Sequence, residues 1–88
     1  MAAHDFIGSL AAALSMFTFL PQAIRVIRTG DTSAISLTTY LIVVVSTLLW
    51  ASYGVLIASA PVIIANVVNC AFGSVVLVRK MIDMRRRR

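Results

Sequence analysis

Charge is scarce in this sequence, and its scarcity excludes several classes of function. Asp, Glu, Lys and Arg make up 12% of the 88 residues, and neither these nor His lies deep in a long apolar run. Proton relays and ion-coupled carriers usually place an ionisable group at membrane depth, so neither is expected. No metal-ligand cluster, nucleophile–base pair or phosphate-binding loop can be assembled, so we expect no catalytic site, metal or cofactor. Cys70 is the lone cysteine, which rules out an internal disulfide.

Apolar residues dominate instead. They make up 60% of the chain, and the mean hydropathy is +0.97. A soluble domain of this size exposes too much surface to carry that many, so the class is an all-α integral membrane protein. Three apolar segments, 6–27, 35–57 and 62–82, are each near the ~20 residues that a helix needs to cross a bilayer. One domain, residues 1–88, is expected.

The basic residues predict an orientation. Arg25 and Arg28 flank the first connection, Arg79 and Lys80 follow the third segment, and a run of four arginines, 85–88, closes the chain. With three crossings, all eight Lys and Arg residues lie on one side of the bilayer. The positive-inside rule then places the C-terminus in the cytoplasm and the N-terminus outside. Because topology explains the net charge of +5, no nucleic-acid partner is expected.

Pro21 and Gln22 interrupt the first apolar segment. Proline has no N–H, so the carbonyl of Phe17 loses its helical partner and the helix is expected to kink. A stray carbonyl is costly in hydrocarbon, and Gln22 and Thr18 are the local side chains that we expect to satisfy it. A kinked helix is a place where a bundle bends, which favours a moving membrane protein over a passive anchor.

The second and third segments carry a polar and aromatic group of side chains. Ser46, Trp50 and Tyr53 follow helical spacing and share one stripe. Trp50, Asn66 and Asn69 are expected at similar depths, on the order of 5–9 Å from the midplane toward the outside. Trp50 is too deep for the interfacial belt. An indole face and a carboxamide together suit a sugar, whose C–H face stacks and whose hydroxyls form hydrogen bonds.

Helix ends and packing positions are also predicted. Thr32 and Ser33 are expected to cap the second helix, and Pro61 to begin the third. Gly54 is expected to admit a close neighbour, and the row Ala65, Asn69 and Gly73 to pack tightly.

These motifs, in order, resemble the bacterial SemiSWEET sugar transporters of the PQ-loop group. The resemblance rests on Phe19-Leu-Pro-Gln22, the two following arginines, the loop 29–36, Trp50-Ala-Ser-Tyr-Gly54, and Pro61 with 65–68. It implies a three-helix bundle in which helix three packs between helices one and two. It also implies that two bundles pair as a parallel homodimer. This agrees with a separate limit, since three helices alone are too few to surround a sugar-sized path.

The resemblance also implies residue roles. Trp50 and Asn66 correspond to the pocket residues of the family, Pro21 with Gln22 to its hinge, and Tyr53 to its outer gate. Ser46 is a further candidate for substrate binding. Asn69 either widens the hydrogen-bonding site or pairs with another helix. Charged residues that latch the outer gate in some members are missing from 57–59.

We therefore expect a homodimeric uniporter, not an enzyme, that moves a small neutral mono- or disaccharide by alternating access across the bacterial cytoplasmic (inner) membrane. Two alternatives stay open. One is transport of another small neutral solute, and the other is a non-transporting membrane adaptor whose basic tail binds a partner or anionic lipid.

Overall fold

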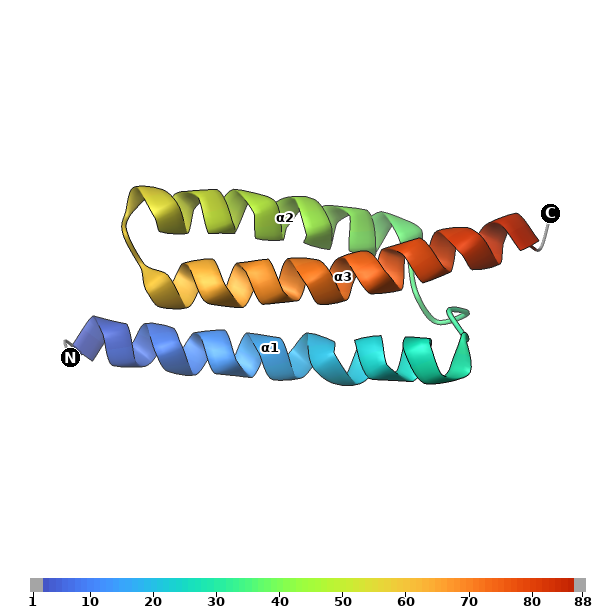
Figure 1. Cartoon of the computed structure of the whole chain (residues 1–88), viewed down its shortest axis with the longest axis horizontal. Coiled ribbons are helices and arrows are strands. Elements are labelled where there is room, and N and C mark those ends of the chain that lie inside the picture. Colours follow the sequence, from blue (N-terminus) through green and yellow to red (C-terminus); the bar gives the residue numbers. More distant parts are fainter. Residues whose placement is uncertain (1–2, 87–88) are drawn as a thin grey trace.

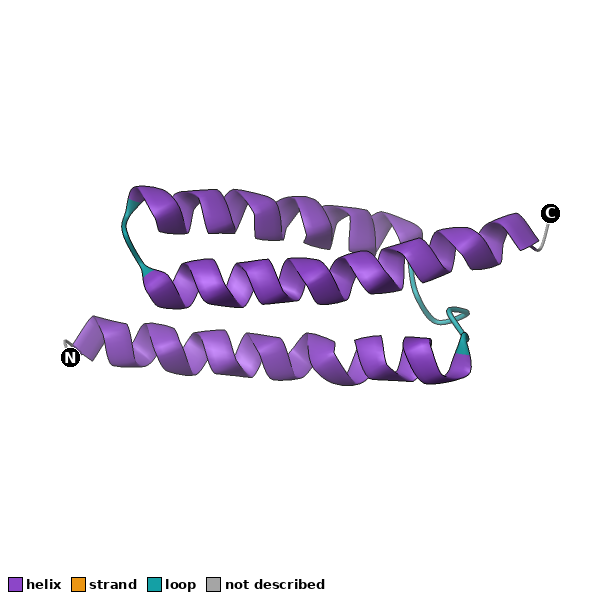
Figure 2. Ribbon diagram, in the orientation of Figure 1, coloured by secondary structure: helices purple, strands orange, loops and turns teal. Residues whose placement is uncertain are grey.

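Three long helices make up the fold. The computed structural model describes residues 3–86, of which residues 3 and 4 as backbone alone. Helix α1 spans Ala3–Thr29, α2 spans Leu37–Leu56 and α3 spans Ala60–Arg86 (Figures 1 and 2). All three are long and apolar enough to cross a membrane, with mean hydropathies of 1.6, 1.7 and 2.1 over an 18-residue stretch of each. The prediction of an all-α protein with three membrane-spanning helices is confirmed.

Helix α3 is the centre of the bundle. Both α1 and α2 pack against it, and Figure 1 shows α3 lying between them. The expected arrangement, with helix three between one and two, is therefore confirmed. The buried apolar core is small and lies toward the end of the bundle that holds the α1–α2 loop: Ala23, Val26, Tyr40 and Val76. Most large apolar side chains point outward, as lipid-facing side chains do.

Helix α1 continues without a break through Pro21 to Thr29. Thr18 was expected to satisfy the freed carbonyl of Phe17, but its hydroxyl donates to Leu14 O at 3.1 Å instead. A threonine within a helix commonly donates its hydroxyl to the carbonyl four residues earlier, and Thr18 does so here. The side-chain oxygen of Gln22 accepts a hydrogen bond from the Tyr40 hydroxyl, so Gln22 joins α1 to α2.

The start of α2 corrects the predicted cap. Ser36 is the N-cap, and its hydroxyl accepts from the backbone N–H of Thr39 at 3.2 Å. Ser33 lies in the loop, where its N–H donates to Asp31 Oδ1 at 2.9 Å. Thr32 is fully buried, because its side chain is used in a contact with α3 instead. The prediction failed because several Ser and Thr residues precede the apolar run, and each is a competent cap.

The α1–α2 loop is fastened to the last turns of α3. Thr32 Oγ1 donates to Asp83 Oδ2 at 2.7 Å, and Lys80 Nζ donates to the carbonyl oxygen of Thr32 at 3.0 Å. Gly30 adopts φ +67°, which favours glycine, and a Cβ there would lie 3.1 Å from the Arg79 guanidinium. These contacts with α3 therefore hold the loop in place at this end of the bundle.

Small residues set the helix spacing as predicted. A Cβ added to Gly54 would lie 3.0 Å from atoms of both Val62 and Ile63, so the start of α3 packs directly on α2. Ala65, Asn69 and Gly73 are all buried along α3. Pro61 lies in the first turn of α3. Backbone N–H groups in a first turn have no acceptor within the helix, so proline costs no hydrogen bond there.

Candidate functional site

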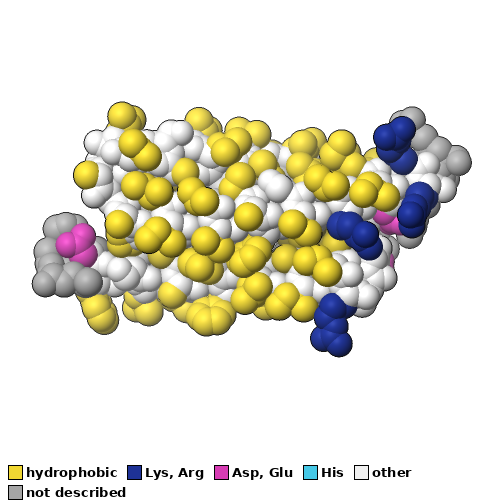
Figure 3. All heavy atoms as spheres, in the orientation of Figure 1, with side chains coloured by type: hydrophobic (Ala, Val, Ile, Leu, Met, Phe, Trp, Pro, Cys, Tyr) yellow, Lys and Arg dark blue, Asp and Glu magenta, His cyan; other side chains and the backbone are white. Residues whose placement is uncertain are grey.

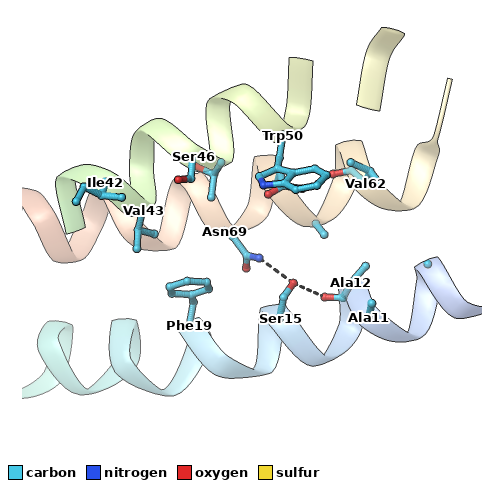
Figure 4. A pocket seen from close by; sticks show the side chains of 14 residues that line it. Ala11, Ala12, Ser15, Phe19, Ile42, Val43, Ser46, Trp50, Val62 and Asn69 are labelled. Carbon is cyan, nitrogen blue, oxygen red and sulfur yellow. Dashed lines mark hydrogen bonds between the residues drawn. The ribbon is translucent and has the colours of Figure 1, made fainter. Parts of the chain in front are cut away.

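A cavity of about 540 Å³ lies among the three helices (Figure 4). Its volume falls within the ~300–1,000 Å³ typical of small-molecule sites, and its walls are mostly apolar, as in such sites. The polar or amphipathic side chains that line it come from all three helices: Ser15, Ser46, Thr47, Trp50, Asn66 and Asn69. The four residues predicted to bind substrate are therefore brought together on one cavity.

Trp50 and Tyr53 form an aromatic pair on α2. Their ring centroids are 5.7 Å apart and the planes meet at 83°, an edge-to-face arrangement. The Trp50 indole lines the cavity, and Figure 4 shows it extending along the wall toward Val62. Tyr53 lies outside the cavity lining but shares an adjoining recess of about 310 Å³ with Trp50 and Leu49. Tyr53 is therefore placed next to the predicted binding residue rather than within the site.

Asn66 is half-buried on α3. Its amide nitrogen donates to the carbonyl oxygen of Val62, one turn earlier, at 2.8 Å. A carboxamide has two N–H donors and one carbonyl acceptor, so this bond leaves hydrogen-bonding capacity for a ligand. Asn66 also lines a second cavity of about 310 Å³ between α2 and α3, together with Thr47 and Cys70. Asn66 and Thr47 thus line both cavities.

Asn69 is almost fully buried, with 2% of its surface exposed. Its amide nitrogen donates to Ser15 Oγ on α1 at 3.0 Å, and Ser15 Oγ in turn donates to Ala12 O at 2.9 Å. Of the two roles left open for Asn69, pairing with another helix is thus observed. Its carbonyl oxygen Oδ1 is the one buried side-chain polar atom among the described residues that has no hydrogen-bond partner.

The α1 side of the cavity was not predicted. Gly8, Ala12, Ser15 and Phe19 line it at helical spacing, and three of the four are small. That spacing is visible in the sequence, as is the polar Ser15 among apolar neighbours. The sequence-based prediction for this helix concerned Pro21 and Gln22, which lie further along it.

Electrostatically the bundle has a basic end and a neutral site. Figure 3 shows Lys and Arg side chains gathered at one end of the molecule, with hydrophobic side chains spread along the rest of the visible face. That end holds the α1–α2 loop and the last turns of α3 (Figure 1). The residues that line the cavity include no ionisable side chain. Among the described residues, no group of three His, Cys, Asp or Glu is placed to hold a metal ion.

Comparison with known proteins decides the family. Residues 5–82 match the family model MtN3_slv, described as a sugar efflux transporter for intercellular exchange. The chain belongs to this family. The description is that of a transporter and not of an enzyme, in agreement with the prediction from the sequence. Together with the three membrane-spanning helices, membership makes the chain a multi-pass membrane protein.

Curated relatives of this MtN3_slv chain carry the name sugar transporter SemiSWEET. The relative from Leptospira biflexa is 38% identical over 91% of this chain and 94% of its own length. The relative from Escherichia coli is 35% identical over 91% of this chain and 90% of its own length. The relative from Bradyrhizobium diazoefficiens is 36% identical over 85% of this chain and 87% of its own length. The resemblance inferred from the motifs is confirmed.

Solved structures agree with the sequence matches. A crystal structure described as SemiSWEET in the inward-open conformation superposes with a TM-score of 0.89 at 33% identity, covering 99% of this chain and 94% of that one. A crystal structure of a bacterial homologue of SWEET transporters gives a TM-score of 0.82 at 29% identity, covering 91% and 96%.

Proposed function

We propose that this protein is a facilitative transporter that carries a small neutral mono- or disaccharide across the membrane by alternating access. The observation that carries the proposal is the cavity of about 540 Å³ on which Trp50, Ser46 and Asn66 meet. The indole face stacks on the C–H face of a sugar, and the amide and hydroxyl exchange hydrogen bonds with its hydroxyls. A lining without ionisable groups favours a neutral substrate that moves down its own gradient.

The transporting unit is a parallel homodimer. Helices α1 and α2 both pack on α3, so the cavity between them has α3 as its floor and lacks a fourth wall within one chain. Trp50 and Tyr53 are each about half exposed beside this opening. A second copy related by a two-fold axis closes the opening with the same surface and presents a second Trp50 and Asn66 to one substrate.

Pro21 and Gln22 form the hinge, and Tyr53 closes the outer mouth. Pro21 removes a backbone hydrogen bond from α1, so the inner half of that helix bends at low cost. The bond between Gln22 and Tyr40 ties the moving half to α2 in the present conformation. Tyr53 supports the Trp50 ring from its edge, so closing the mouth and holding the sugar involve the same aromatic pair.

The basic end of the bundle faces the cytoplasm, and the N-terminus lies outside. This orientation follows from the positive-inside rule applied to Arg25, Arg28, Arg79 and Lys80. The bacterial sources of the SemiSWEET relatives favour the bacterial cytoplasmic (inner) membrane as the location.

Uptake of labelled glucose and sucrose into proteoliposomes tests this function. We expect saturable uptake by the wild type, unchanged by a protonophore, and its collapse in Trp50→Ala and Asn66→Ala. Ser52→Ala is the matched control, because Ser52 lies on α2 outside the cavity and bonds its own backbone at Leu48. Uptake of neither sugar by inserted dimers would redirect the assignment to another neutral solute or to an adaptor.

A further inference from the structure

The strongest unexplained feature is the carbonyl oxygen of Asn69. It is buried without a hydrogen-bond partner among the described residues, in a side chain of which 2% is exposed. A buried acceptor without a donor loses its hydration and gains nothing in return. A donor is therefore missing at this position.

Ser15 cannot supply that donor. Its single hydroxyl hydrogen is given to the carbonyl oxygen of Ala12, and its oxygen accepts from the Asn69 amide. Turning the carboxamide by half a rotation exchanges the two ends of the group but still leaves one end without a partner, because Ser15 contacts one end at a time. In the orientation observed, the end left over is the carbonyl oxygen, so the partner that this pair lacks is a donor.

The position of the pair identifies where the donor comes from. Asn69 and Ser15 both line the cavity of about 540 Å³. Figure 4 shows Asn69 reaching from α3 toward α1, between Phe19 and Ser15, and the Trp50 indole on the α2 side of the same cavity. The rest of the α1 side is apolar, formed by Phe19 and small residues. The cavity is therefore the space next to this acceptor in which a donor would lie.

We propose that Asn69, oriented by Ser15, accepts a hydrogen bond from one hydroxyl of the sugar and so determines specificity for that hydroxyl. The inference rests on the proposed function and adds a third polar contact to those of Asn66 and Ser46. Trp50 and Asn66 hold the substrate from α2 and α3. The Asn69–Ser15 pair recognises the side of the substrate that faces α1.

A site with a buried acceptor discriminates against a ligand that lacks the matching hydroxyl, because the acceptor is then left unpaired. One such contact corresponds to roughly tenfold in kcat/KM. We therefore expect the wild type to prefer glucose over one monodeoxyglucose by about that factor. In Asn69→Leu the preference for that single hydroxyl is lost, while preferences for the other hydroxyls are kept.

The experiment compares uptake of glucose and of 2-, 3-, 4- and 6-deoxyglucose into proteoliposomes by the wild type, Asn69→Leu and Ser15→Ala. Ser15→Ala is expected to weaken the same preference by a smaller factor, since the amide stays but loses its orienting bond. Cys70→Ala is the matched control, because Cys70 is the next residue on α3 and lies outside this cavity. Asn69→Thr serves where the leucine variant does not form dimers, and it is expected to retain part of the preference.

The outcomes separate this inference from the proposed function. Loss of one hydroxyl preference in the Asn69 variants, with the others intact, supports it. An equal drop in uptake of all five sugars would overturn it and assign Asn69 a packing role, while leaving sugar transport in place. Uptake of none of the sugars by the wild type would overturn the proposed function, and this inference with it.

Discussion

The hydroxyl of Tyr40 on α2 donates a hydrogen bond to the side-chain oxygen of Gln22 on α1, one residue after Pro21. Tyr40 is buried, and the bond links the two outer helices of the bundle at the point where α1 lacks a backbone bond. The residue that follows the proposed hinge is therefore joined to α2 by a side-chain hydrogen bond. If α1 bends at Pro21 as proposed, this hydrogen bond favours the conformation seen here over one in which the half of α1 after Pro21 has moved.

Removing that link is expected to loosen the inner half of α1. Hydrogen bonds between membrane helices average about 0.6 kcal/mol, which corresponds to roughly a threefold change in an opening equilibrium. In Tyr40→Phe we expect amide hydrogen exchange across residues 24–29 to accelerate by about that factor. Tyr53→Phe is the control, since Tyr53 has no contact with Gln22. Unchanged exchange in this segment would show that the link does not hold α1.

Restoring the backbone bond at position 21 is expected to slow transport. In Pro21→Ala the new N–H bonds the carbonyl of Phe17, and breaking a bond of about 1 kcal/mol when the helix bends lowers uptake roughly fivefold. Dimer formation and sugar binding are expected to stay unchanged. The measurement pairs initial uptake rates with calorimetric binding. Pro61→Ala is the control, because Pro61 lies in a first helical turn where proline removes no backbone hydrogen bond. Uptake by Pro21→Ala at the wild-type rate would contradict the hinge assignment.

The fastening of the loop to α3 is expected to contribute to stability. Thr32 is fully buried and donates to the Asp83 carboxylate at 2.7 Å. Valine has nearly the same shape but leaves the carboxylate oxygen without this donor, so Thr32→Val should lower the free energy of unfolding by about 2 kcal/mol. Denaturation in detergent measures the change. The exposed Thr38→Val is the control, and equal stability of the two variants would contradict the prediction.

Two glycines are expected to respond in opposite directions to alanine. At Gly54 a Cβ meets atoms of Val62 and Ile63 at 3.0 Å, and overpacking of this kind costs about 1–3 kcal/mol. At Gly8 nothing lies within 4 Å of the new Cβ, and alanine improves a helix interior by up to about 1 kcal/mol. Thermal unfolding of both variants in one detergent compares them. A loss of stability at both positions would mean that the space beside Gly8 is filled in the assembled protein.

The helices could be predicted closely because hydropathy and length alone specify a membrane span. The predicted segments differ from the observed helices by one to four residues at each end. The largest difference is at the end of α3, which continues to Arg86. Charged residues end an apolar segment, but arginine, lysine and methionine are good helix formers, so the helix runs on past the hydrocarbon.

The site could be predicted in part. Depth and helical spacing brought Trp50, Asn66 and Asn69 to one level, and they line one cavity. The partners of Asn69 and Thr32 could not be predicted, because Ser15 lies 54 residues from Asn69 and Asp83 lies 51 residues from Thr32. Pairings at that range depend on helix rotation and tilt, which packing against neighbours sets and local pattern does not encode.

The central position of α3 has a consequence for biosynthesis. Synthesis proceeds from the N-terminus at roughly 5–20 residues per second, so α1 and α2 leave the ribosome first. Neither has its packing partner at that moment, because both pack on α3. Packing of the two helices in the bilayer is therefore delayed until α3, Ala60–Arg86, has been synthesised. A ribosome that stalls before α3 leaves two spans without the helix on which both pack.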